Sequence, residues 1–339
     1  MAHELDFTRG QAAIAFRGAV PWHGLGESIL PEDSIDDIRI KAGLDYDVIK
    51  TPVRYDREAY STSFIDGKGT VHETSKDKCV LYRSDTGDDL SVVSTQYQVV
   101  QPREIVDFYK DLTEKFGFEL EVVGALKGGR KVWALANTNE AFALRDDDKV
   151  RGYLLLATSY DGTMATQARF TSVRVVCNNT LTCAVGQGRP DISVPHSTKF
   201  DASRVKAQLG IGEGWERFRQ FSDTAQSRIV TRKEQVKLLL AAYYGLDTDE
   251  KLEAARQDEK QSATIEKFMD RMSIALHESP GAKLRSANGT LWGLLSAVTY
   301  DIDHQAPSRT ADNRLNKAWF GTGEQIKRRA LSLAEALAA

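Results

Sequence analysis

The chain has 339 residues and a mass of 37.7 kDa, which exceeds one average domain and favours two packed units or one large core with an appended helical part. Its residues are 41% hydrophobic and 27% charged, a composition that excludes a largely disordered, collagenous or coiled-coil protein. The 45 basic residues are matched by 48 acidic ones, so the formal net charge is -3 and indiscriminate binding to polyanions is excluded. Any nucleic-acid surface must therefore be local.

The cysteine usage and the N-terminal residues predict a cytoplasmic protein. The three cysteines, Cys79, Cys177 and Cys183, form neither a C-x-x-C pair nor an even disulfide framework, which favours a reducing compartment. Charged residues interrupt the first 18 positions, so no signal peptide is expected, and no apolar run approaches the ~20 residues that span a bilayer. We expect no membrane contact.

The periodicity of the apolar residues predicts an α+β fold with a mixed N-terminal domain over residues 1–200 and a helical domain over residues 201–339. In the first half, Ser34 can cap a short helix, and residues 46–55, 78–83 and 90–100 follow as strands. Pro102 suits the first turn of a helix that places Ile105, Phe108, Tyr109 and Leu112 on one face.

Two hairpins are the clearest signal in the first half. Residues 118–126 and 131–137 flank a turn with paired glycines, and residues 150–160 and 163–177 flank Asp161 and Gly162. Together they predict an antiparallel β-meander of about four strands as the N-terminal core. Beyond Lys199, apolar residues at helical spacing predict a series of helices, the last one carrying Ile326, Ala330, Leu333 and Leu337.

Several motifs are missing, and their absence excludes large classes of enzyme. The sequence contains no phosphate-binding G-x-x-x-x-G-K-[ST] loop, no G-x-G-x-x-G, no H-E-x-x-H and no G-x-S-x-G. ATPases, dinucleotide-dependent oxidoreductases, common zinc proteases and α/β-hydrolases are therefore disfavoured. We expect a protein without a cofactor and assign no catalytic residues, which favours a binding protein over an enzyme.

The first constellation that bears on function is the segment from Thr171 to Leu181. On a strand, Arg174 and Asn178 share one face, and with Arg169 they offer guanidinium and amide donors that suit phosphate oxygens. Between Thr163 and Phe200 four cations stand against one acid. In the alternative interpretation, these arginines only pair with acids such as those at positions 146–148.

The second constellation lies at the end of the helix that carries Leu291 to Ile302. Asp301 and His304 are three residues apart and share a helix face, which suits a metal or a general base, while Asp303 points elsewhere. A hydrogen-bonded Asp and His pair near a helix C-terminus is the structural alternative.

The third constellation is the segment from Arg309 to Arg329, in which six cations oppose two acids and two aromatic residues are interleaved. Arg314, Trp319, Lys327 and Arg328 suit a single strand of nucleic acid, because bases stack on rings while cations follow the backbone. A basic helix face with a buried tryptophan is the alternative.

The order of several short motifs resembles a known family. The motifs are Pro21 to Gly26, Ala42 to Asp45, Val173 to Leu181, Gly289 to His304, and Trp319 to Gly323 followed by Lys327 and Ala330. In this order they are similar to the phage- and plasmid-borne "domain of unknown function 932" family. The resemblance implies a mobile-element setting, and no catalytic roles can be carried over from it. The meander followed by helices is also similar in outline to single-strand annealing recombinases of the Rad52 and Red-beta kind.

These observations lead to one main hypothesis and two alternatives. We expect a protein that binds or anneals single-stranded DNA without ATP in recombination or replication, with Arg169, Arg174 and Asn178 on the phosphates. In this hypothesis Arg314, Trp319, Lys327 and Arg328 extend the groove, and the resemblance to annealing proteins implies a homo-oligomer. The alternatives are a metal-dependent nuclease or other hydrolase that uses Asp301, Asp303 and His304, and a non-enzymatic protein that blocks a host defence.

Overall fold

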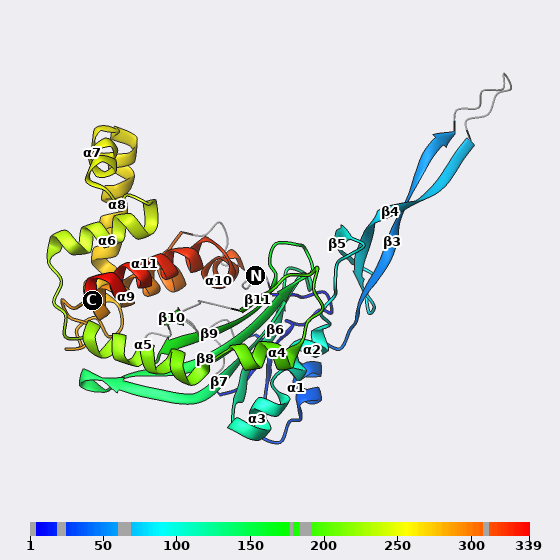
Figure 1. The fold of residues 1–339 in the computed structure, drawn as a ribbon, viewed down its shortest axis with the longest axis horizontal. Coiled ribbons are helices and arrows are strands. Elements are labelled where there is room, and N and C mark those ends of the chain that lie inside the picture. The colour runs from blue at the N-terminus through cyan, green and yellow to red at the C-terminus, as the bar shows by residue number, and fades with distance from the viewer. Residues whose placement is uncertain (1–4, 19–24, 60–68, 177–178, 184–191, 308–311) are drawn as a thin grey trace.

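A computed structural model describes residues 5–18, 25–59, 69–176, 179–183, 192–307 and 312–339 of the chain. It confirms the predicted α+β class, with an antiparallel sheet region in the N-terminal half and helices in the C-terminal half (Figure 1).

The centre of the molecule is an eight-stranded sheet with the order β10-β9-β8-β7-β6-β1-β2, in which β11 also pairs with β9. Its strands are β1 (Ile14–Phe16), β2 (Glu27–Ser28), β6 (Glu119–Leu126), β7 (Lys131–Leu144), β8 (Asp148–Ser159), β9 (Thr166–Arg174), β10 (Asn179–Cys183) and β11 (Ile192–Val194). All neighbours are antiparallel except β1 and β2, so the predicted meander is confirmed as β6 to β9. Both predicted hairpin turns lie where the glycines indicated, because Gly129 and Gly162 adopt positive φ angles.

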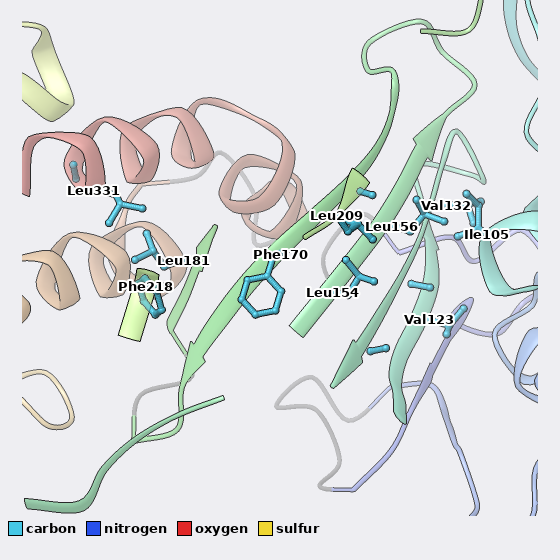
Figure 2. Packing of buried hydrophobic residues seen from close by; sticks show 14 of the residues in the cluster. Ile105, Val123, Val132, Leu154, Leu156, Phe170, Leu181, Leu209, Phe218 and Leu331 are labelled. Carbon is cyan, nitrogen blue, oxygen red and sulfur yellow. The ribbon is translucent and has the colours of Figure 1, made fainter. Parts of the chain in front are cut away.

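The two faces of this sheet are covered by different parts of the chain. Alternate residues of β8, such as Leu154 and Leu156, belong to the main hydrophobic core, which Phe218 and Leu331 of the C-terminal half share (Figure 2). The intervening residues, such as Leu155, belong to a second cluster on the opposite face. The main core therefore includes side chains from both sides of the predicted boundary near Lys199.

Short helices accompany the N-terminal strands. They are α1 (Ile35–Lys41), α2 (Pro102–Asp107) and α3 (Lys110–Phe116). Ser34 caps α1 through a capping box with Asp37, as its position before the apolar residues predicts. The single helix predicted after Pro102 is two helices, α2 and α3, because the helix is interrupted at Phe108 and Tyr109. Both aromatic side chains are buried.

A second, three-stranded sheet has the order β3-β4-β5, with β3 (Val48–Ala59), β4 (Gly69–Arg83) and β5 (Asp89–Ser94). Its base joins the main core through Val48, Cys79 and Leu81. The outer part of β3 and β4 projects away from the rest of the molecule as a long hairpin (Figure 1). The sequence indicated only the inner part of β4, since residues 69–77 are mostly polar and lack an apolar alternation.

The C-terminal half is helical, as predicted. Its helices are α4 (Ala202–Gln208), α5 (Ile211–Ala225), α6 (Arg232–Tyr244), α7 (Asp249–Gln257), α8 (Glu259–Glu278), α9 (Leu291–Tyr300), α10 (Asp312–Phe320) and α11 (Thr322–Ala338), with a π-helical turn, η3 (Asp301–Gln305), directly after α9. Helix α5 packs Trp215 and Phe218 against Phe142 and Phe170 of the sheet. Helix α10 lies on the other face, where Leu315, Trp319 and Phe320 contact the second cluster. In the described part of the chain, no helix combines the length and apolarity that a membrane span requires.

Candidate functional site

The structure brings several of the predicted site residues together where α10 and α11 pack on β9 and β10. We call Arg169, Thr180, Asp303, Glu324 and Lys327 the α11 cluster. These side chains come from β9, β10, η3 and α11, and the outermost members, Arg169 and Lys327, lie more than 150 positions apart in the sequence. The pocket that Arg169, Thr180, Glu324 and Lys327 help to line has a volume of about 10 Å³, which is enough for one water molecule and not for a substrate.

Lys327 occupies the centre of the α11 cluster and is 1% exposed. Its ammonium group donates to Asp303 Oδ1 at 2.9 Å and to Thr180 Oγ1 at 2.8 Å. The other carboxylate oxygen of Asp303 accepts from the backbone N–H of Thr180 at 2.7 Å and lies 3.0 Å from its hydroxyl oxygen. This closed triangle holds α11 and η3 on the sheet edge, so Lys327 is not presented to a ligand.

Arg169 lies beside this triangle and is also buried. Its guanidinium donates to the backbone carbonyl of Trp319 at 2.7 Å and to the side chain of Gln167, and it lies 3.8 Å from Glu324. Arg328 donates to the same Glu324 at 2.7 Å. Arg169 therefore positions the end of α10 on the sheet.

Trp319 is half-buried and lies between the sheet and the helices, where it also packs against the small cluster of Ile302, Ala306 and Ala318. Its ring packs edge-on against Trp133 of β7, with 5.2 Å between the ring centroids. Phe320 follows it, with the ammonium group of Lys131 at 5.5 Å from its ring centroid. Trp133 and Trp319 pack on each other. Phe320 is therefore the aromatic side chain of α10 whose ring lies next to buried cations.

Two cations of α10 are bound to neutral acceptors. Arg314 donates to the backbone carbonyl of His304 at 2.6 Å, and Lys317 donates to the backbone carbonyl of Pro307 at 3.1 Å. Neither has an acidic partner among the residues that the structure describes. The Nε atom of Arg314 is buried without a hydrogen-bond acceptor in the same described set. These two positive charges are therefore oriented but not neutralised.

Arg174 lies in a different environment, on the far side of β9. It makes a bidentate ion pair with Asp148, with N···O distances of 2.7 to 3.0 Å, and both side chains are almost fully buried. Asp148 also accepts from Ser286 at 2.7 Å and from Trp292 at 3.1 Å. Arg174 therefore offers no exposed donor to phosphates, and it pairs with Asp148, one of the acids that the alternative interpretation named. Asn178, predicted to share its face, lies outside the described residues.

Gly281 lies against the Arg174 guanidinium, and its carbonyl accepts from Nη2 at 3.1 Å. The φ angle of Gly281 is +78°, and a Cβ atom there would lie 2.9 Å from the same nitrogen. A glycine is needed here because of both the backbone conformation and the close approach of the guanidinium. This contact connects the loop before α9 to the central sheet.

The residues of the predicted metal or hydrolase site diverge. Asp301 is fully buried and accepts from Arg271 Nε at 2.6 Å and from the Tyr243 hydroxyl at 2.7 Å. Burial, followed by the charge of Asp301, raises the pKa of Tyr243 well above its usual value, so the hydroxyl stays a donor. His304 instead packs on Tyr300, with 4.9 Å between the ring centroids.

The π-helical turn explains why the predicted spacing of these residues was wrong. Asp301 and His304 share a face only if the helix keeps 3.6 residues per turn, and η3 does not. Among the residues that the structure describes, no three His, Cys, Asp or Glu side chains gather in a way that could hold a metal ion. Asp303 is bound to Lys327, so the three residues do not form one site.

Sequence reasoning missed the partners of these groups more than the groups themselves. Arg271 and Glu324 lie far along the chain from Asp301 and Arg169, and no spacing rule connects them. Only Asp148 was named beforehand as a possible partner of Arg174. The only available signal was charge: the cations of β9 needed acidic partners, and the sequence offered the acids at positions 146–148 among others.

Comparison with known proteins agrees with the motif order. A family model described as "Domain of unknown function (DUF932)" matches residues 89–319, about two thirds of the chain. This range includes the sheet from β5 onward and the helices through α10, while the long hairpin precedes it and α11 follows it. Comparison with curated proteins and with solved structures gives no match. The chain therefore belongs to the DUF932 family, whose shared segment contains both the Asp148–Arg174 pair and the π-helical turn.

Proposed function

We propose that the protein binds single-stranded DNA and promotes annealing without ATP, in recombination or replication. The observation that carries this proposal is the pair of cations on α10, Arg314 and Lys317, which neutral carbonyl oxygens orient without neutralising. Phosphate oxygens would be stronger acceptors for both groups than the carbonyls that they now contact.

The surroundings of α10 support the same proposal. Phe320 is only partly buried, and two cations lie near its ring, Lys131 at 5.5 Å and Arg169 at 6.0 Å from the centroid. Aromatic side chains among cations are the arrangement that binds single strands with little sequence preference. The absence of a phosphate-binding loop from the sequence agrees with a role that does not consume ATP.

The residues that act in this proposal differ from the ones that the sequence suggested. Arg314 and Lys317 would contact phosphates, and Phe320 would stack on a base. Arg328 is paired with Glu324, so it would have a structural role. Arg169, Lys327 and Trp319 would instead hold these helices on the sheet, because their polar groups or rings are occupied within the protein. Arg174 would have only a structural role.

The test is fluorescence anisotropy of a labelled 30-nucleotide single strand, measured with the full chain over a series of salt concentrations. Binding through phosphates predicts that the affinity falls steeply as salt rises, with a slope of roughly 0.7 per contact for single strands. The double variant Arg314→Gln with Lys317→Gln should weaken binding and lower that slope by about 1.4, because two contacts are lost. An annealing assay with two complementary strands and no nucleotide then measures the activity itself.

The matched control is Lys260→Gln with Lys267→Gln on the exposed side of α8, which removes the same charge from another helix. Equal losses in both double variants would show that only the total charge matters. Absence of binding by the folded wild-type protein would refute the proposal.

The hydrolase alternative has weaker support, because Asp301, Asp303 and His304 have separate partners. It predicts that DNA incubated with Mg²⁺ or Mn²⁺ yields products that disappear in an Asp301→Asn variant. Lack of cleavage with either metal would reject it.

A further inference from the structure

The loop between β5 and α2, residues 95–101, attaches the smaller sheet to the rest of the molecule. On one side, its carbonyl groups at Thr95 and Tyr97 accept from the ammonium group of Lys50 in β3, at 3.1 and 2.9 Å. On the other side, the Tyr97 hydroxyl donates to the backbone carbonyl of Ser159 in β8 at 2.6 Å. The β5–α2 loop therefore links the two sheets through side-chain hydrogen bonds as well as through the chain itself.

His196, two residues beyond β11, holds this loop from the side of the central sheet. Its ring stacks on Tyr97, with 4.3 Å between the ring centroids and 15° between the planes. Its backbone carbonyl accepts from the N–H of Gln98. Its Nδ1 atom lies 3.1 Å from the carbonyl oxygen of Gln98, and its Nε2 atom lies 3.2 Å from that of Met164, in the β8–β9 turn. One side chain thus contacts both the loop and the central sheet.

Both ring nitrogens of His196 face oxygen atoms that only accept hydrogen bonds. A neutral imidazole carries one N–H, so it donates to one carbonyl and turns a lone pair toward the other, whereas an imidazolium donates to both. The contact with Met164 is partly buried and the contact with Gln98 is exposed. The neutral ring therefore keeps its hydrogen bond to Met164, where water replaces it less easily, and the hydrogen bond to Gln98 requires the second proton.

The groups around His196 keep a single charge near neutral pH. The charged or titratable side chains of the elements that meet here include Tyr97, Asp161, Lys50, Lys131 and Lys199. Burial raises the pKa of the Tyr97 hydroxyl above its usual value, so it stays neutral. Burial opposes the charged form of Asp161, but hydrogen bonds from Thr163 outweigh it and lower the pKa of Asp161, so it stays charged. The three lysines are positively charged. Of these groups, His196 is the one whose charge changes near neutral pH.

Burial sets the direction in which the proton acts. His196 is half-buried against Tyr97, and burial lowers its pKa below the usual 6.5, although the two carbonyl contacts oppose this change. Protons therefore bind more readily when the loop has moved away and the ring is in water than when the loop is attached. The attachment is strongest above pH 6.5 and weakens as the pH falls below it. The extra hydrogen bond to Gln98 reduces this loss but does not reverse it.

We propose that His196 is a pH-sensitive latch between the two sheets: the neutral ring holds the β5–α2 loop on the central sheet, and protonation loosens that hold. The contacts of Lys50 and the Tyr97 hydroxyl with their carbonyl acceptors do not change in this pH range, so the loop is loosened rather than released. Because the loop continues directly from β5, the smaller sheet with its long hairpin is then held less firmly on the rest of the molecule. This inference does not depend on the proposed function.

Amide hydrogen exchange of the full chain tests the latch, with protection factors that correct for the intrinsic pH dependence of exchange. The protection factor of the Gln98 amide should fall by about twofold or more between about pH 7.5 and about pH 5.5, because the proton favours the detached loop. His196→Phe keeps an aromatic ring on Tyr97 without a titrating group, so its protection factor should not change with pH. The matched control is His277→Gln, which removes an exposed histidine of α8 and should keep the wild-type pH dependence.

An NMR titration of the ring nitrogens gives a second measurement, for which the wild-type protein is sufficient. It should show that His196 titrates below pH 6.5 and that the neutral ring carries its proton on Nε2. Titration at or above pH 6.5, a neutral ring protonated on Nδ1, or an equal Gln98 protection factor at both pH values would overturn the proposal. So would a pH dependence that persists in His196→Phe. If that variant does not fold, His196→Gln, which keeps a donor and an acceptor, takes its place.

Discussion

The cations of the two basic segments of the chain have different hydrogen-bond acceptors in the fold. Arg174 in β9 is bound by two oxygens of a fully buried carboxylate, whereas Arg314 and Lys317 in α10 are bound by backbone carbonyls. The sequence shows both as local excesses of positive charge. In the structure the first is neutralised and holds the core together, and the second keeps its charge near the surface.

The difference teaches that a local charge count does not distinguish a binding surface from a buried pair. What distinguishes the two is the hydrogen-bond acceptor. A carboxylate neutralises the charge of the cation, whereas a neutral oxygen only orients its side chain. Arg174 should therefore matter for stability and Arg314 and Lys317 for binding. Each of the following predictions tests one side of this comparison.

The largest loss of stability should follow Asp148→Asn. The amide keeps the shape of the carboxylate but leaves the Arg174 charge buried without a counter-charge, which should lower the free energy of unfolding by about 3–5 kcal/mol. Urea titration followed by circular dichroism measures this. Asp146→Asn is the matched control, because Asp146 pairs with the exposed Arg285 and should have a far smaller effect. Equal losses of unfolding free energy in the two variants would mean that burial does not determine how much an ion pair contributes to stability.

A smaller loss should follow Lys327→Met. The substitution keeps the apolar stem and removes the ammonium group, but Asp303 retains two contacts with Thr180, so we expect a loss of about 2 kcal/mol. Adding Asp303→Asn to this variant should restore part of the stability, since the buried carboxylate then carries no unpaired charge. Losses that simply add in the double variant would show that the two side chains do not act as a pair.

Much of the fold could be predicted from local signals. The paired glycines and the Asp161 and Gly162 turn specify hairpins by backbone conformation alone, and both formed. Ser34 and Pro102 marked helix starts for equally local reasons. The outer half of β4 was missed, because residues such as His72, Glu73 and Thr74 do not alternate with apolar ones when neither face packs on a core.

The candidate site was less predictable, because its geometry depends on contacts between distant parts of the chain. Lys327 meets Thr180 across 147 positions, and nothing in the sequence around either residue indicates the other. The π-helical turn changes the spacing on which the shared face of Asp301 and His304 depends, and no residue of that segment marks it. The residue types were recognised correctly, but whether they faced solvent or each other was decided by packing.

A third prediction concerns pH and another neutralised cation, Arg83. Burial opposes the charged form of Asp85, but hydrogen bonds from Arg83 and Arg9 outweigh it and lower the pKa of Asp85 from 3.8 to about 2. A lowered pKa stabilises the fold above pH 4, and this contribution is lost as the pH falls from about 4 to about 2. Asp85→Asn should therefore reduce stability at neutral pH and flatten that part of the acid-unfolding curve. An unchanged slope between pH 4 and pH 2 would contradict the assignment.

The smallest effect on stability should come from Arg314→Gln combined with Lys317→Gln. Both side chains are partly exposed and donate to carbonyl oxygens, and glutamine can still donate, so the free energy of unfolding should change by less than about 0.5 kcal/mol. The same urea titration used for Asp148→Asn measures it. Among the described side chains these two charges have no acidic partner, so they repel each other. The double variant should therefore be slightly more stable than wild type at low salt, and this difference should shrink as the salt concentration rises. A loss as large as that of Lys327→Met would mean that these cations are structural. The type of acceptor, a carboxylate or a carbonyl oxygen, would then no longer distinguish the structural cations of this protein from those proposed to bind a ligand.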